Sequence, residues 1–83
     1  MKAEFHDLYK VIGANIKFFR IELGWTQDEL ASRCSVNRAK ISKIENARKD
    51  YMLSTLLEVC KALNKTLEEV IDRYLYVQYK TGL

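Results

Sequence analysis

The segment 26–45 contains two short helical patterns that are joined by only three residues. Apolar residues recur at helical spacing in each pattern, and we expect helices at about 27–34 and 38–45. A connection as short as residues 35–37 makes consecutive helices cross at a large angle. Both apolar faces must then meet one common core, which makes this pair the strongest constraint on the fold.

Helical spacing also covers most of the remaining chain. It predicts further helices at about 4–23 and 53–63 and from residue 67 onward. Proline is absent and only 3 glycines occur in 83 residues, whereas turn-rich β folds need many more turn formers. The sequence therefore predicts an all-α fold, a compact five-helix domain that spans residues 1–83 and surrounds one core.

Polar residues that cap helices mark the predicted ends. Thr26 and Thr66 each begin a capping box, with a glutamate three residues later. Asn37 is a good N-cap for the helix at 38–45. Gly24 and Asn64 stand where a left-handed residue ends a helix. These residues place several boundaries independently of the apolar pattern.

Basic side chains gather around the second of the two short helices. The net charge of the chain is only +3, so the position of the charge is more informative than its total. Between residues 33 and 49 the basic residues are Arg33, Arg38, Lys40, Lys43, Arg48 and Lys49, and the acid is Glu45. This cluster favours an anionic partner, and an ordinary solvated helix face is the alternative interpretation.

Residues that catalysis or metal binding would need are scarce. His6 is the single histidine, and Cys34 and Cys60 match no metal-binding spacing. A glycine-rich phosphate loop is missing, and so short a chain has little bulk for a substrate pocket. We therefore expect no enzymatic activity, cofactor, metal site or small-molecule substrate. Free thiols without a signal peptide predict the cytoplasm, and no apolar run is long enough to span a membrane.

Residues 12–71 resemble the helix-turn-helix domain of the phage Cro/cI repressor class, also called the XRE family. The resemblance rests on Thr-Gln-x-Glu-Leu-Ala at 26–31 and Ile-Ser-x-Ile-Glu at 41–45. It implies a lambda-repressor-like DNA-binding domain in which helices 2 and 3 form the helix-turn-helix. The family usually has glycine where Ser35 and Ala47 stand, and an alanine at positive φ would be strained.

The resemblance implies that the third helix lies in the major groove of double-stranded DNA. Base contacts would then come from Arg38, Ala39, Ser42 and Lys43. The chemistry of these side chains agrees with that role. An arginine can donate two hydrogen bonds to the O6 and N7 atoms of guanine, lysine can reach the same atoms, and an alanine can contact a thymine methyl group.

Other polar residues of the motif are expected to hold phosphates and set the register on DNA. They are Thr26, Gln27, Asn37, Lys40, Asn46, Arg48 and Lys49. Arg20 and Glu45 match a family ion pair that ties the first helix to the end of the third. We expect this pair to be structural.

The end of the chain is richer in apolar residues than a small monomer should expose. Leu75, Tyr76, Val77 and Tyr79 are the candidates for a dimer interface within residues 67–83. A homodimer would read a palindrome whose half-sites lie about one helical turn, ~34 Å, apart. The alternative is that the tail folds back onto its own core near Phe5 and Tyr9.

Two functional interpretations follow from the sequence. The first is a cytoplasmic, sequence-specific transcriptional regulator, either a repressor or similar to a restriction–modification controller. The second is an antitoxin-like module on the same fold that masks a toxin and autoregulates its operon. A protein partner distinguishes the second interpretation, because it would dock on the terminal helices and not on Arg38 and Lys43.

Overall fold

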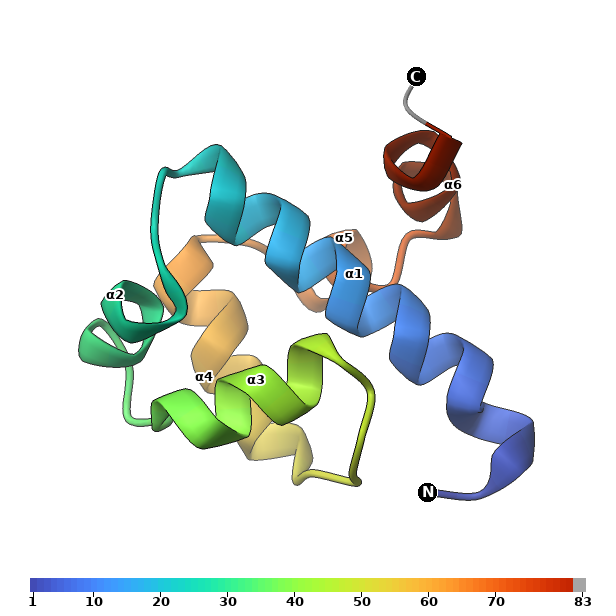
Figure 1. Cartoon of the computed structure of the whole chain (residues 1–83), viewed down its shortest axis with the longest axis horizontal. Coiled ribbons are helices and arrows are strands. Elements are labelled where there is room, and N and C mark those ends of the chain that lie inside the picture. Colours follow the sequence, from blue (N-terminus) through green and yellow to red (C-terminus); the bar gives the residue numbers. More distant parts are fainter. Residues whose placement is uncertain (82–83) are drawn as a thin grey trace.

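The computed structural model describes residues 1–81, and side chains within 1–77. Its elements are η1 (Ala3–Phe5), α1 (His6–Glu22), α2 (Gln27–Ser32), α3 (Arg38–Glu45), α4 (Leu53–Leu63), α5 (Leu67–Val70) and α6 (Arg73–Thr81). No strand occurs within the described part, which confirms the all-α prediction. Figure 1 shows α1 running across the molecule, with α2, α3 and α4 on one side of it and α6 on the other.

The core is built from every helix between α1 and α5. Its buried members are Ile12, Ile16, Phe19, Leu30, Val36, Ile41, Ile44, Leu56, Val59, Cys60, Leu63 and Val70. In α4, the helical spacing of Leu53, Leu56, Leu57, Cys60 and Leu63 predicts one buried stripe. That prediction is partly wrong, because Leu53 and Leu57 are 60% and 45% exposed while Val59 is fully buried. The buried face of α4 therefore lies about one residue further round the helix than the leucine spacing indicates.

The two short helices begin at the residues that the caps predict. The Thr26 hydroxyl accepts from the Glu29 amide at 3.1 Å, and the Asn37 side chain accepts from the Lys40 amide at 2.9 Å. The box at Thr26 is only half formed, because the Glu29 carboxylate accepts instead from Arg33 at 2.9 Å. Helix α2 ends at Ser32, two residues before the predicted end.

The segment predicted as a single fifth helix is divided into α5 and α6. Its start is as predicted, with a complete capping box between Thr66 and Glu69. Asn15 of α1 is fully buried, and its Nδ2 atom donates to the carbonyls of Val70 and Asp72 at 2.9 and 3.0 Å. These carbonyls are held by a side chain of another helix, and the chain changes direction between α5 and α6.

Helices α1 and α3 cross at very close range. A methyl group added at Gly13 would lie 2.5 Å from the Ile44 carbonyl oxygen and 2.6 Å from that of Glu45. Both atoms belong to the backbone of α3 and cannot give way cheaply. Gly13 is therefore the residue that lets the end of α3 rest against α1.

The turn after α3 contains a strained alanine. Ala47 has φ +52° and is 5% exposed, and the following amide of Arg48 donates to the Lys43 carbonyl at 3.0 Å. This geometry ends α3 in the left-handed conformation that suits glycine. The strain expected from the sequence at this position is therefore present. Gly24 and Asn64 also have positive φ, as predicted.

Candidate nucleic-acid interface

Helices α2 and α3 form a rigid angular unit because their apolar residues are buried together. Leu30 and Ile41 are fully buried, and Val36 in the connection is 5% exposed. The outer side of α3 is left uncovered by the rest of the molecule (Figure 1). A protruding short helix of this kind has the dimensions that the major groove of DNA admits.

A buried hydrogen-bonded ion pair fixes the far end of α3. The Nε and Nη2 atoms of Arg20 donate to the Glu45 carboxylate at 2.7 and 3.0 Å, and Nη1 donates to the Trp25 carbonyl at 2.7 Å. The side chain of Glu45 is 1% exposed, and that of Arg20 is 10% exposed. Satisfying most polar atoms of both groups offsets the cost of removing two charges from water.

Gln27 connects this buried pair to the surface of α2. Its Nε2 atom donates to Oε1 of Glu45 at 3.1 Å, which orients the side chain in the absence of DNA. Gln27 also lines an open hollow with Arg38, Ala39 and Ser42. The structure thus brings one predicted backbone residue next to three predicted base-contact residues.

Arg38 has a neighbour on α2 that the sequence pattern does not predict. Its Nε atom lies 3.7 Å from Oδ1 of Asp28 on α2, and both side chains are largely exposed. Asp28 is the residue after Gln27 in the motif, and its sequence position alone shows no relation to Arg38. Contact between them depends on the angle at which α2 and α3 cross.

The remaining predicted phosphate contacts fall into two groups. Thr26, Asn37 and Asn46 are engaged with backbone atoms, and Asn46 Nδ2 donates to the Ser42 carbonyl at 2.8 Å. The second group consists of Lys40, Arg48 and Lys49, which are exposed on or just after α3. Among residues 1–77, no carboxylate lies within ion-pair distance of these three side chains or of Lys43. Their charges are therefore available to an anionic partner.

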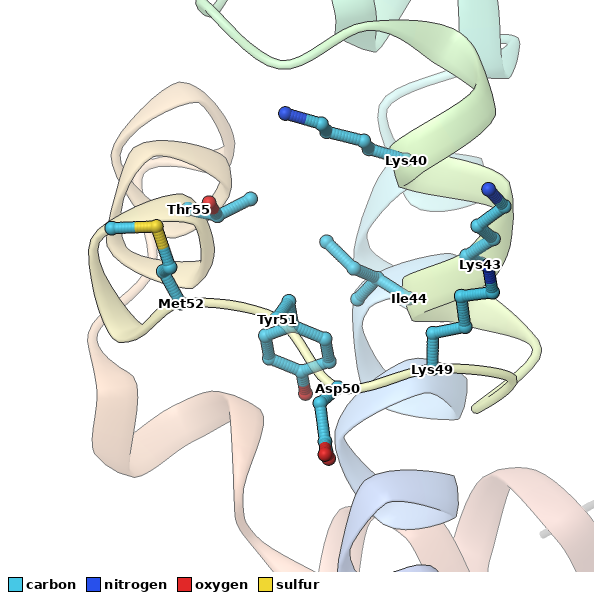
Figure 2. A pocket seen from close by; sticks show the side chains of 8 residues that line it. All are labelled: Lys40, Lys43, Ile44, Lys49, Asp50, Tyr51, Met52 and Thr55. Atoms are coloured by element: carbon cyan, nitrogen blue, oxygen red, sulfur yellow. The ribbon is translucent and has the colours of Figure 1, made fainter. Parts of the chain in front are cut away.

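A second hollow lies between α3, the following loop and the start of α4 (Figure 2). It measures about 260 Å³ and is lined by Lys40, Lys43, Ile44, Lys49, Asp50, Tyr51, Met52 and Thr55. Figure 2 shows the Asp50 carboxylate pointing away from the lysines. A hydrogen bond from Tyr9 and the amino-terminal ammonium group of Met1, 3.3 Å away, lower the pKa of Asp50.

The predicted dimer residues lie on or beside α6, which packs against α1. Leu75 is partly buried against the core, Tyr76 is partly buried, and Val77 is 51% exposed. Arg73 of α6 donates to Asp7 of α1 at 3.3 Å. The side chain of Tyr79 lies outside the described residues. Leu75 therefore contributes to the core of its own protomer, while Val77 presents apolar surface.

Within the described residues there is neither a metal-ligand cluster nor a membrane-spanning helix. No cluster of three or more His, Cys, Asp or Glu side chains able to hold a metal occurs in that part of the chain. None of the helices there combines the length and the apolar character needed to cross a bilayer.

Comparison with known proteins identifies the family. The family model described as "Helix-turn-helix" matches residues 16–70. A hypothetical transcription factor of Neisseria meningitidis serogroup B is 37% identical over 57 residues, which cover 69% of this chain and 54% of the relative. The chain thus spans about half the length of that relative. The solved structure of a Neisseria hypothetical transcription factor has a TM-score of 0.75, with 29% identity and 84% of each chain covered.

Two further relatives bear on the two functional interpretations. Control protein C.SmaI of Serratia marcescens is 28% identical over 69 residues, covering 83% of this chain and 82% of the relative. Antitoxin HipB of Escherichia coli is 33% identical over 52 residues, covering 63% and 59%. The family match over most of the chain confirms the resemblance seen in the sequence. This chain belongs to the helix-turn-helix family.

Proposed function

We propose that this chain is a sequence-specific DNA-binding transcription regulator that acts as a homodimer on a palindromic operator. The observation that carries the proposal is the exposed side of α3, whose position is held by the buried Arg20–Glu45 pair. Lys43 on this side has no carboxylate partner among the described residues, and Arg38 has only the distant contact with Asp28. Under this proposal the protein binds DNA in the cytoplasm and catalyses no reaction.

Each group of residues has a distinct role in the proposed complex. Arg38, Ala39, Ser42 and Lys43 read base edges. Thr26, Gln27, Asn37, Lys40, Asn46, Arg48 and Lys49 contact the backbone and set the register. Backbone contacts supply affinity but carry no sequence information directly. Dimerisation is proposed because an eight-residue helix reads only a few base pairs, and two copies tied together multiply their affinities.

The control-protein relative supports the regulator class, and we propose that the chain acts as a repressor or a restriction–modification controller. The antitoxin interpretation requires a second surface for a toxin. Charge reversal at Arg38 and Lys43 separates the two interpretations, since it would abolish DNA binding and leave toxin masking intact. Co-purification of a partner with that variant would favour the antitoxin.

The test is selection of bound duplexes from a random-sequence pool, followed by fluorescence anisotropy on the enriched and a scrambled duplex across a salt series. We expect enrichment of a two-fold symmetric sequence that binds at least about 10³-fold more tightly than the scrambled duplex. Arg38→Ala should lose about 1–3 kcal/mol and relax the preference at one base pair.

Lys49→Ala should weaken binding to all duplexes and lower the salt slope by about one unit. Lys61→Ala is the matched control, since Lys61 is an exposed lysine on α4 outside both hollows. Recovery of a pool without any enriched sequence, together with equal affinity for both duplexes, would exclude sequence-specific recognition.

A further inference from the structure

Helix α1 is contacted on two different sides by the two elements on which the proposed function depends. Gly13 meets the backbone of α3 at Ile44 and Glu45. Asn15 follows two residues later, roughly 200° further round the helix, and its side chain meets the junction between α5 and α6. Figure 1 shows α3 on one side of α1 and α6 on the other. The position of α6 relative to α3 therefore depends on contacts made within a single turn of α1.

Asn15 holds the point at which α6 begins. Its Nδ2 atom donates to the carbonyls of Val70, which ends α5, and of Asp72, which directly precedes α6. The Asp72 carbonyl also accepts from the amide of Tyr76 at 3.3 Å, and the Asp72 side chain accepts from the amide of Tyr74 at 2.9 Å. The first hydrogen bonds of α6 are thus made to a residue whose carbonyl is fixed by α1.

Two other contacts tie α6 to the rest of the protomer, and both constrain its direction less. The ion pair between Arg73 and Asp7 joins two side chains that are more than half exposed, and exposed pairs of this kind contribute little. Leu75 packs partly buried against the core, but apolar attraction is non-directional and tolerates small rotations. Of these three contacts, only the Asn15 bonds are both buried and directional.

The buried amide of Asn15 also carries an energetic cost. Its Oδ1 atom has no hydrogen-bond partner among residues 1–77, and a buried polar atom without a partner lowers stability. An apolar side chain would avoid the unpaired oxygen but would lose the hold on two carbonyls. Buried polar groups favour one defined arrangement where apolar packing permits several. The arrangement at Asn15 therefore favours a defined junction over maximal stability.

We propose that Asn15 is a positioning residue that fixes the distance between the two α3 helices of the dimer, and thereby the half-site spacing that the dimer accepts. This inference rests on the proposed function, because it takes α6 as the dimer interface and α3 as the helix that reads DNA. In a two-fold dimer, a change in the angle of α6 acts on both protomers and moves both α3 helices. One added base pair displaces a half-site by ~3.4 Å and rotates it by about 36°, so a small rotation at the junction alters the accepted spacing.

The test is fluorescence anisotropy on duplexes that carry the selected half-site twice as an inverted repeat, with the spacer lengthened or shortened by one and two base pairs. A duplex with a single half-site is measured alongside. We expect the parent chain to lose at least tenfold in affinity when the spacer is changed, and Asn15→Ala to lose less than threefold or to prefer another spacer. Both proteins should bind the single half-site equally, because the contacts of α3 with Gly13 are unchanged.

Two further variants separate positioning from stability. Asn15→Ser keeps a hydrogen-bond donor in a smaller side chain and should recover part of the spacing preference. Val59→Ala is the matched control, because it removes a fully buried side chain from α4, which packs against α1, α2 and α5. This control should lose stability and keep the spacing preference of the parent, since a merely structural change does not turn α6.

The outcomes distinguish this inference from the function on which it rests. A folded Asn15→Ala that keeps the spacing preference of the parent would overturn it, as would an equal loss of preference in Val59→Ala. If neither Asn15 variant folds, as judged by circular dichroism, Asn15 is needed for the whole domain and a role confined to α6 is excluded. Failure of the proposed function looks different, because the parent would then bind two half-sites no more tightly than one.

Discussion

At the residue scale, Ala47 shows the energetic cost of placing a residue with a side chain in the left-handed backbone conformation. Its φ of +52° lies where L-residues other than glycine are strained, and its methyl group is almost fully buried. The left-handed conformation costs an alanine about 1–2 kcal/mol. The surrounding turn nevertheless keeps its hydrogen bonds, because the amides of Ala47 and Arg48 donate to the carbonyls of Ile44 and Lys43 at 3.2 and 3.0 Å.

We predict that Ala47→Gly stabilises the domain by about 0.5–1 kcal/mol. Release of the strain exceeds the loss of about 0.5–1 kcal/mol that glycine brings through its greater freedom in the unfolded chain. Urea unfolding measures the difference. Ala39→Gly is the matched control, because Ala39 is exposed within α3 and should lose about 1 kcal/mol. A loss of stability in Ala47→Gly would show that the buried methyl group outweighs the strain.

Tyr51 carries a second residue-scale prediction. Burial raises the pKa of Tyr51 to about 12, and its hydroxyl group has no hydrogen-bond partner among the described residues. Because the pKa in the folded state exceeds the unfolded value of about 10, its stabilising contribution is complete below pH 10 and is lost as the pH rises toward 12.

Tyr51→Phe lacks this ionisation and the unpaired hydroxyl group. We expect the variant to be at least as stable as the parent at pH 7, since a buried unsatisfied group costs about 1–3 kcal/mol. Its advantage should grow between pH 10 and pH 11, and thermal unfolding at several pH values would measure it. Parallel stability curves for the two proteins across that range would contradict the assignment.

At the element scale, the position of α3 depends on two contacts with α1 that work together. Gly13 permits the backbones to approach, and the Arg20–Glu45 pair holds the end of α3 at that distance. Gln27 adds the start of α2 to the same network. The position of α3, the proposed reading helix, is therefore set mainly by Gly13, Arg20 and Glu45, which are buried behind its exposed side.

Glu45→Ala should destabilise the domain by about 3–5 kcal/mol, because it leaves the Arg20 guanidinium buried and unpaired. Chemical denaturation measures this loss, and Glu22→Ala on the exposed side of α1 is the matched control. The combined variant Arg20→Met with Glu45→Leu should recover much of the loss, since no charge is then buried. An unchanged unfolding midpoint in Glu45→Ala would refute the structural role of the pair.

At the scale of the whole molecule, α6 leaves the bundle and packs only partly on α1 (Figure 1). Leu75 faces inward, and Val77 is half exposed beside it. The sequence left two alternatives for this segment, a dimer interface and a tail that folds back onto its own protomer. The structure has features of both, because α6 contacts α1 and still presents apolar surface. A two-fold interface through the outer side of α6 is the use that we propose for that surface.

Val77→Asp should raise the dissociation constant of the dimer by at least about 100-fold. An unpaired charge in an apolar interface costs several kcal/mol, and each 1.4 kcal/mol is a factor of ten. Analytical ultracentrifugation distinguishes the protomer of 9.7 kDa from its dimer. Lys61→Asp serves as the control for added charge on another exposed helix surface. A parent chain that stays monomeric at high concentration would refute this interface.

The sequence by itself determined the fold class, the helix-turn-helix and most helix boundaries. These features depend on short-range patterns, such as the caps at Asn37 and Thr66, whose partners lie within a few residues. The family was also recognisable, since its motif is continuous along α2 and α3.

Only the tertiary structure decided the contacts between distant segments. Asn15 separates α5 from α6 through carbonyls more than fifty residues away in the chain. The hollow beside Lys43 exists because the turn at Ala47 returns the chain so that Tyr51 and Met52 meet α3. Residue patterns encode which side chains are apolar or charged, but the helix crossing and the path of the loop decide which of them meet.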